Sequence, residues 1–472
     1  MFGELPEAWH TLLHGLGLAV AVLHLAFVPL VLARRSEPAV TLAWLLCLML
    51  LPAVGVVLYW VFGRGAVRRS ARARRALLAA RQRTEPEPDY AKLPEHLRPL
   101  VRTAWEAGRA ALTLGNRVDV LIDAAQVYPA KLEAIRSAKL SITCAYYVFR
   151  HDETGRIFRI ALQEAAARGV EVRVLLDAFG APGQGRFWAP LRRAGGRVVR
   201  FLPFNPLQGW SLNLRNHRKI LIVDGEIGFT GGLNIGDEYY GTPALGAWRD
   251  THIRLRGPAV RPLAAVFADD WAFATGELPP LPIASPSDPE GSAVQILPSG
   301  PDDRAEAIYR ATFAALCTAE RSVEVTTPYY IPDRPMAEAR ESAAMRGVRV
   351  RLLLPGRNNQ RLTALASRSY WDELLQAGVE IYRYLPGMVH AKCLVVDRVW
   401  GSVGTANLDV RSFKLNFEVN ALLYGPKEVG DLADSIEADF AKSERVDTAA
   451  FRGRPWWGKA AEGGARLLSP IL

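Results

Sequence analysis

Two stretches of the sequence carry the same polar residues at the same spacing. After each of two histidines, a lysine stands at +2, an aspartate at +7, a glycine at +14, a small residue at +15 and an asparagine at +17. The first copy holds His217, Lys219, Asp224, Gly231, Gly232 and Asn234, and the second holds His390, Lys392, Asp397, Gly404, Thr405 and Asn407. A lone histidine is more often a core residue than a catalytic one, but a duplicated pattern indicates function.

One histidine beside one lysine supplies half of what transfer at a phosphate needs. One group must attack the phosphorus, and another must protonate the leaving oxygen. Two copies brought face to face would supply two imidazoles, two ammonium groups and two amides around one phosphate. The lysines and asparagines would stabilise charge on the phosphate oxygens, which Mg²⁺ does in other enzymes. The sequence shows no hard-metal ligand pattern, so we expect no metal and no cofactor.

Apolar runs inside the two copies indicate the elements that position these groups. Residues 220–223 and 394–396 are apolar throughout, which predicts strands buried on both faces. Side chains two apart on a strand share a face, so the histidine and the lysine of each copy point the same way.

The remaining motif residues have other expected tasks. Asp224 has the opposite parity and precedes Gly225, a hairpin-turn signal, so we expect the motif aspartates to brace turns. After the turn the chain returns to a small residue and an amide, where backbone can approach a ligand and the amide can donate to an anion. These phosphate-binding candidates are Gly232, Thr405, Asn234 and Asn407.

The duplicated pattern resembles the phospholipase D superfamily, and residues 404–418 and the apolar N-terminus are similar to bacterial cardiolipin synthases. The resemblance implies a phosphatidyltransferase that condenses two phosphatidylglycerol molecules to cardiolipin and glycerol through a phosphatidyl-histidine intermediate. By analogy, His217 is the nucleophile and His390 the general acid and base. The catalytic motif residues that the resemblance implies are His217, Lys219, Asp224, His390, Lys392 and Asp397.

Two further acids occupy matching places in the repeat. Asp250 and Glu418 each precede a Gly-Pro pair by seven residues. A carboxylate at these places can hold an imidazole in one tautomer and stabilise its protonated form. In the superfamily such an acid accompanies each motif histidine, and the alternative for both residues is an exposed acid at a strand end.

Further repeats show that the whole catalytic body is duplicated. Residues 168–176 recur as 346–354, and residues 200–203 recur as 383–386. We predict the α/β class: two phospholipase D-like domains whose mixed sheets pack face to face around one active site. The expected boundaries are 111–275 and 291–446 for the two domains, 276–290 for the linker between them and 447–472 for a C-terminal tail.

Composition favours contact with a membrane. Hydrophobic residues make up 50% of the 472 residues, and the net charge of +10 implies an anionic partner, either nucleic acid or an acidic lipid surface. Four scattered cysteines without a CxxC pair indicate small buried residues in a reducing compartment.

The N-terminal residues 1–63 predict a transmembrane helical hairpin, with helices over about 11–33 and 39–62. A signal peptide is the alternative, but the first ten residues contain two glutamates and no basic residue, and the apolar run is too long. Pro52 interrupts the second run, which membrane helices tolerate. A shallow or re-entrant hairpin is the other arrangement that these residues permit.

Arginine counts predict the orientation. Residues 64–110 form a basic juxtamembrane linker whose first part carries six arginines, whereas the link between the helices carries two. We therefore expect a multi-pass protein of the bacterial cell (inner) membrane with cytoplasmic catalytic domains. Its expected partners are phosphatidylglycerol and other anionic membrane lipids, with no nucleic acid.

Other functions stay open at this point. The same motif fits a phospholipid hydrolase, a transferase that uses another acceptor alcohol, or a nuclease. A nuclease gains little from two apolar helices, and an intact double motif argues against a scaffold without enzymatic activity.

Overall fold

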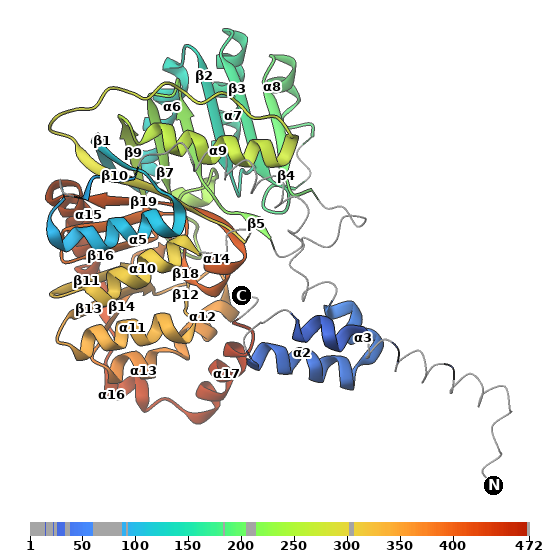
Figure 1. The fold of residues 1–472 in the computed structure, drawn as a ribbon, viewed down its shortest axis with the longest axis vertical. Helices are drawn as coiled ribbons and strands as arrows, with labels where there is room; N and C mark the ends of the chain where they lie inside the picture. Colours follow the sequence, from blue (N-terminus) through green and yellow to red (C-terminus); the bar gives the residue numbers. More distant parts are fainter. Residues whose placement is uncertain are drawn as a thin grey trace. The chain divides into compact units, whose positions relative to one another are not determined.

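The computed structural model describes residues 15, 22, 26–33, 38–59, 87–90, 93–182, 185–203, 214–301 and 306–469. The chain divides into a small N-terminal unit and a large unit that holds both motif copies, and each is described by itself (Figure 1).

The second of the two expected N-terminal helices is broken, whereas most of the first, expected over about 11–33, lies outside the described residues. Residues 26–32 are helical, and the run expected to form one helix over 39–62 is broken into α2 (Pro38–Leu50) and α3 (Pro52–Leu58). The break follows from Pro52, which cannot continue the helical hydrogen bonding and clashes with the preceding turn. The two short helices pack against each other. Gly55 permits this close approach because it has no Cβ, and a Cβ there would lie only 2.6 Å from the carbonyl oxygen of Cys47.

The N-terminal unit has a small core and many exposed apolar side chains. Val31, Leu48 and Tyr59 are buried together. The exposed set on α2 and α3 includes Leu42, Leu46, Met49, Leu50, Leu51, Val54 and Val57. Among the described residues, helices with enough length and hydropathy to span a bilayer are absent.

One mixed sheet of sixteen strands forms the frame of the large unit. Its order is β20-β14-β13-β11-β16-β17-β19-β10-β1-β9-β7-β6-β2-β3-β4, with the short β5 paired to β19. The strands of the first half are β1 (Leu112–Ile122), β2 (Ser141–Tyr146), β3 (Glu171–Asp177), β4 (Arg197–Phe201), β5 (Arg215–Asn216), β6 (Ile220–Val223), β7 (Ile227–Gly231) and β9 (Thr251–Arg256). Those of the second half are β10 (Ser292–Ser299), β11 (Ser322–Thr326), β13 (Arg349–Pro355), β14 (Glu380–Tyr384), β16 (Cys393–Val396), β17 (Trp400–Gly404), β19 (Asn416–Tyr424) and β20 (Ser443–Arg445).

The two halves share this sheet, whereas separate sheets were expected. Strand β1 pairs antiparallel with β10, so neither half has a free edge at the junction. The halves also contact one another away from this junction: β17 contacts β7 and β9, and one apolar cluster joins Ile253 and Leu255 to Val403 and Val419. Strands β2, β3 and β4 are parallel to one another, as are β11, β13 and β14, and the other neighbours along the path are antiparallel.

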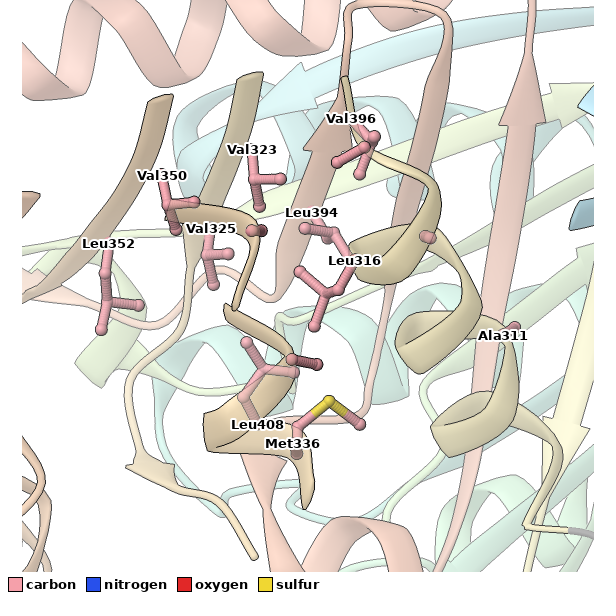
Figure 2. Close-up of a cluster of buried hydrophobic side chains, with 14 of the residues drawn as sticks. Ala311, Leu316, Val323, Val325, Met336, Val350, Leu352, Leu394, Val396 and Leu408 are labelled. Carbon is pink, nitrogen blue, oxygen red and sulfur yellow. The ribbon is translucent and has the colours of Figure 1, made fainter. Parts of the chain in front are cut away.

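Helices cover the sheet in three clusters. The first half is covered by α6 (Asp123–Ser137), α7 (Glu153–Ala167) and α8 (Ala189–Arg193), and the second by α10 (Ala307–Thr318), α11 (Arg334–Met345), α12 (Arg361–Arg368) and α13 (Trp371–Gln376). Helices α9 (Val260–Thr275) and α15 (Pro426–Phe440) pack in the cluster shared by the halves. Figure 2 shows Leu316 of α10 facing Val325 and Leu394 of the second-half strands.

Two segments are more ordered than expected. Part of the predicted linker 64–110 is helix α5 (Arg98–Gly108), which packs against α10 and β10 of the second half. The C-terminal tail contains α16 (Thr448–Arg452) and α17 (Trp456–Arg466), which are tied to the second half by buried Phe451 and Ala465.

The cysteines are unpaired, as expected. Cys144 and Cys393 are buried, but Cys317 is exposed, contrary to the expectation of buried thiols, and Cys47 is half-buried.

The motif aspartates brace turns and stand apart from the histidines. Asp224 and Gly225 have φ values of 54° and 71°, the geometry of the predicted hairpin turn between β6 and β7. The Asp224 carboxylate accepts backbone hydrogen bonds from residues 139–141 at 2.7 to 2.9 Å, and Asp397 accepts three from residues 320–322. Each aspartate lies a full strand away from its lysine and holds strand ends together, as expected of a turn brace, while the catalytic role that the resemblance implies stays a prediction.

Because Asp397 braces a turn, its replacement should lower the stability of the fold without abolishing the catalytic reaction. Asp397→Ala removes a charged acceptor of three backbone hydrogen bonds, so the free energy of unfolding should fall by about 2 kcal/mol or more. A thermal melt should show a lower Tm, with activity per folded molecule unchanged at low temperature. Asp397→Asn is the matched control, because it retains one acceptor and tolerates positive φ, and its Tm should fall less. Full stability with abolished turnover would contradict the assignment.

Candidate active site

Two short strand pairings bring the motif copies together. Strand β5 lies parallel to the start of β19, and β15 (Gly387–Val389) lies parallel to β8 (Ala247–Arg249). The backbone N–H of His217 donates to the carbonyl of Phe417 at 2.9 Å, and that of His390 donates to the carbonyl of Arg249 at 2.7 Å. His217 is thus placed beside β19, which carries Glu418, and His390 beside the end of β8, which Asp250 directly follows.

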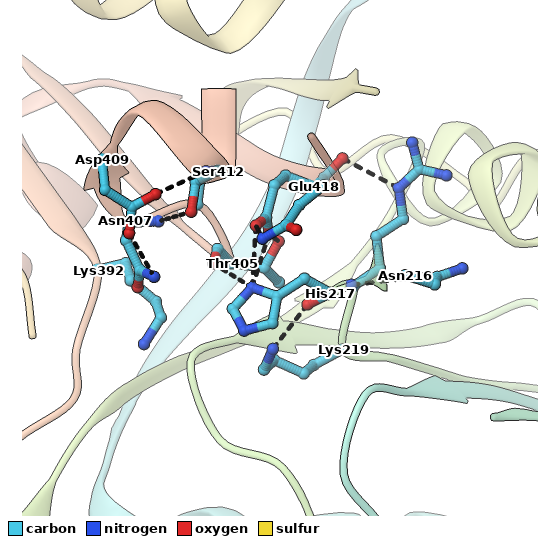
Figure 3. A network of polar contacts seen from close by, with 12 residues as sticks. Asn216, His217, Lys219, Lys392, Thr405, Asn407, Asp409, Ser412 and Glu418 are labelled. Carbon is cyan, nitrogen blue, oxygen red and sulfur yellow. Dashed lines mark hydrogen bonds and ion pairs between the residues drawn. The ribbon is translucent and has the colours of Figure 1, made fainter. Parts of the chain in front are cut away.

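The acids of the two halves are exchanged between the histidines. Nδ1 of His217 lies 2.9 Å from Glu418, and Nδ1 of His390 lies 2.7 Å from Asp250. Both expected acids therefore contact a motif histidine, but each contacts the histidine of the other half. Figure 3 shows Glu418 and Thr405 next to the imidazole of His217. A carboxylate at Nδ1 favours the tautomer that carries its proton there, which leaves Nε2 with a lone pair.

Both lysines are held beside their histidines. Nζ of Lys219 donates to the backbone carbonyl of His217 at 2.6 Å, and Nζ of Lys392 donates to that of His390. Lys219 is fully buried and Lys392 is 3% exposed. Their ammonium charges therefore act in a poorly solvated site. In the described part of the chain, groups of three His, Cys, Asp or Glu side chains that could hold a metal ion are absent.

Burial shifts the pKa of every group at the centre. It lowers the pKa of His217 to about 4 and that of His390 to about 3, and the neighbouring lysines act in the same direction. Burial also lowers the pKa of Lys219 to about 7 and that of Lys392 to about 8. At neutral pH both imidazoles are thus neutral, and Nε2 is able to act as a nucleophile.

The two acids remain ionised. Burial by itself would raise the pKa of Glu418, but His217 and Lys219 outweigh it and the pKa is lowered. The pKa of Asp250 is lowered in the same way by His390 and Lys392.

The two asparagines already have protein partners. The side-chain amide of Asn234 donates to the hydroxyl of Tyr239 at 2.6 Å and accepts from the backbone of Val148. The side-chain amide of Asn407 donates to Asp409 at 3.1 Å. In this structure the asparagines fix neighbouring loops, and each amide nitrogen keeps a second hydrogen with which it could donate to a phosphate.

The small residues of the motif make room for the acids. A Cβ at Gly232 would lie 2.0 Å from Oδ1 of Asp250, so this position accommodates a carboxylate where approach to a ligand was expected. In the second copy the threonine hydroxyl of Thr405 donates to Glu418 at 2.5 Å. Gly232 and Thr405 therefore help to position the two acids, and their phosphate-binding role stays a prediction.

Aromatic rings around the histidines were not assigned from the sequence. The ring centroid of Tyr147 lies 5.2 Å from that of His217, while Trp248 and Tyr239 lie 5.3 and 5.7 Å from His390. Tyr147 belongs to a Tyr-Tyr pair that recurs in the second half, which was the available signal. Trp248 has no such signal, because its position depends on the pairing of β8 with β15.

Family comparisons agree with the two-half architecture. Residues 132–261 and 313–443 match the family described as "Cardiolipin synthase, PLD-like domain". Residues 18–64 match the family described as "Phospholipase D-nuclease N-terminal".

The chain is similar to curated proteins over nearly its whole length. Cardiolipin synthase of Geobacillus thermodenitrificans is 39% identical over an alignment that covers 96% of this chain and 93% of that protein. Cardiolipin synthase of Alkalihalophilus pseudofirmus is 38% identical, with 93% and 90% covered. The crystal structure of a phosphatidylserine synthase from Haemophilus influenzae matches with a TM-score of 0.60 at 14% identity, covering 79% of this chain and 99% of that one, which shows the fold alone.

The exchanged acids predict crossed effects of mutation. Glu418→Gln should alter the reactivity of His217, and Asp250→Asn should alter that of His390, because each loses the carboxylate at Nδ1. Turnover should fall by at least ~10²-fold in either variant. Diethyl pyrocarbonate modification followed by peptide mass mapping should show the change at the histidine of the opposite half. A change at the histidine of the same half would refute the crossed arrangement.

The buried lysines predict an alkaline limb in the pH profile. The ammonium forms attract the phosphate, so kcat/KM should fall as pH rises through the lowered pKa values of about 7 and about 8. A bound phosphodiester anion favours the charged lysines, so the limb in kcat should lie at higher pH. Lys219→Arg stays charged and should move the limb upward. A flat kcat/KM between pH 6 and 9 would contradict this account.

Proposed function

The chain belongs to the cardiolipin synthase family and is a phosphatidyltransferase that forms cardiolipin, and we propose that it condenses two phosphatidylglycerol molecules through a phosphatidyl-histidine intermediate. The observation that supports this course best is the pair of neutral imidazoles, each held at Nδ1 by a carboxylate of the other half and flanked by a buried lysine. Such a pair supplies a nucleophile and a separate proton carrier at one phosphate.

In the first step, Nε2 of His217 attacks the phosphorus of one phosphatidylglycerol. The bond from phosphorus to the headgroup glycerol oxygen breaks, and His390 gives that oxygen a proton. His390 acquires this proton when the phosphodiester anion binds, because the anion offsets the lysine charges that contribute to its low pKa. Lys219 and Lys392 stabilise the charge on the phosphate oxygens.

In the second step, His390 is neutral again and takes a proton from the headgroup hydroxyl of a second phosphatidylglycerol. That oxygen attacks the phosphorus, the bond from phosphorus to Nε2 of His217 breaks, and cardiolipin is released. Glu418 stabilises the positive charge on the His217 imidazole while the phosphorus is attached to Nε2.

The proposed location is the bacterial cell membrane, with residues 1–63 as the anchor and the large unit in the cytoplasm. The exposed apolar side chains of α2 and α3 support contact with lipid, and the arginines that follow residue 63 support the orientation. The break at Pro52 favours the shallow or re-entrant hairpin over two straight spanning helices.

Product identity tests the reaction. Purified protein supplied with phosphatidylglycerol alone should yield cardiolipin and free glycerol in equal amounts, and excess glycerol should reverse the reaction. Because lysines supply the positive charge at the phosphate, turnover should survive a chelator, with lipid aggregation controlled for. Phosphatidic acid as the main product would indicate a hydrolase. Cleavage of DNA without lipid turnover would indicate a nuclease.

The assignment of the two histidines has its own test. With labelled phosphatidylglycerol and an acid quench, peptide mapping should find the phosphatidyl group on His217. Alanine at either histidine should remove nearly all turnover, and alanine at either lysine should cost on the order of 10²-fold. Label on His390 would reverse the assignment, and near wild-type turnover in a histidine variant would exclude the two-half site.

A further inference from the structure

A cavity of about 400 Å³ lies in the second half, where the parallel strands β11, β13 and β14 end. Ligands in open α/β sheets bind in crevices beyond the carboxyl ends of such strands. Helix α12 contributes Arg361, Leu365 and Arg368 to the lining. None of the lining residues belongs to the two His-Lys pairs or their acids.

The cavity carries positive charge without a carboxylate in its lining. Its three arginines are Arg361, Arg368 and Arg383. Nε of Arg368 contacts Glu462 at 2.9 Å, but the same glutamate also pairs with another arginine outside the cavity. Arg383 pairs with a glutamate through one terminal nitrogen, while its buried Nε has no hydrogen-bond partner.

Arg361 leaves the charge of the cavity uncompensated. Within the described residues its exposed side chain makes no ion pair or hydrogen bond with protein, and it stands at the start of α12 on the cavity wall. A guanidinium group binds phosphate oxygens in a bidentate fashion, so the missing partner is best supplied by a phosphate.

The remaining wall is apolar. Leu354, Leu365 and Trp371 line it, and Leu365 is 37% exposed at its opening. Helix α17 packs against α12 and exposes Trp456 and Trp457, which are 78% and 65% accessible. Exposed tryptophans are typical of side chains at a lipid–water interface. The cavity thus joins a cationic end to an apolar wall, and the helix that packs against α12 carries two exposed tryptophans.

Helix α12, which lines the cavity, has no counterpart among the described residues of the first half. Between β3 and α8, in the place that α12 occupies in the second half, the described residues include no helix. The site is therefore not a by-product of the duplication.

We propose that this cavity is a second binding site for an anionic phospholipid, with the phosphate held by Arg361, Arg368 and Arg383 and the glycerol and first acyl carbons against Leu354, Leu365 and Trp371. The choice of a lipid over a soluble phosphate ester rests on the proposed function. The cavity shares no lining residue with the two histidine–lysine pairs or their acids.

Photo-crosslinking tests the site in the full chain. The protein carries His217→Ala and His390→Ala to prevent turnover, so the outcome does not depend on cardiolipin formation. Vesicles contain a phosphatidylglycerol analogue with a diazirine near the start of one acyl chain. Peptide mapping should find the label on α12, and a phosphatidylcholine analogue should label it several-fold less.

A charge reversal and its control complete the test. Arg361→Glu should lower the α12 label several-fold, while Arg334→Glu, at an exposed arginine of α11 outside the cavity, should leave it unchanged. Leu365→Asp, a second variant, should lower it too, with thermal melts verifying folding. Unlabelled phosphatidylglycerol should displace the label, and millimolar inorganic phosphate should not. Equal labelling in Arg361→Glu, equal labelling by both lipids, or displacement by inorganic phosphate would overturn the proposal.

Discussion

The structure depends on a hydrogen-bonded exchange between the two halves of the duplicated body. The strand before each motif histidine lies beside a strand of the other half that carries an acid, Glu418, or directly precedes one, Asp250, and the acid then reaches Nδ1 of that histidine. Neither half can complete its own imidazole-carboxylate pair. The pairing of the two halves therefore also forms both imidazole–carboxylate contacts of the candidate active site.

Buried ion pairs reinforce this exchange. Arg218, which stands between the first histidine and its lysine, donates to the backbone carbonyl of Glu418 and pairs with Asp270 at 2.5 Å. Arg249 pairs with Asp439 and donates to the carbonyl of Asp250. A buried ion pair adds little net stability, but removing one partner leaves a costly unpaired charge. The main effect of these arginines is therefore positional: they fix the backbone of both acids relative to the opposite half.

The duplication is not exact, and the differences lie where two lipids have different roles. One histidine faces an aspartate accommodated by Gly232, whereas the other faces a glutamate that is fixed by the hydroxyl of Thr405. Trp248 and Tyr239 surround one imidazole, and Tyr147 lies beside the other. Helix α12 and its cavity occur in the second half. A duplicated fold with unequal surroundings suits a reaction in which one phosphatidyl group is transferred and another lipid receives it.

Much of this architecture could be predicted from the sequence, because it depends on local spacing. The buried strands β6 and β16 and the hairpin turn at Asp224 follow from the apolar runs and turn chemistry. The histidine and lysine of each copy lie just before these strands, at 217–219 and 390–392, so strand parity does not fix their shared face. The matching places of Asp250 and Glu418 also identified the two acids. Tertiary structure decided which acid meets which histidine, because that contact joins residues 140 and 201 positions apart. Tertiary structure also decided that Gly232 makes room for a carboxylate and that Trp248 packs on His390. Neither contact can be inferred from residue spacing along a single strand, because each joins segments that are distant in the sequence.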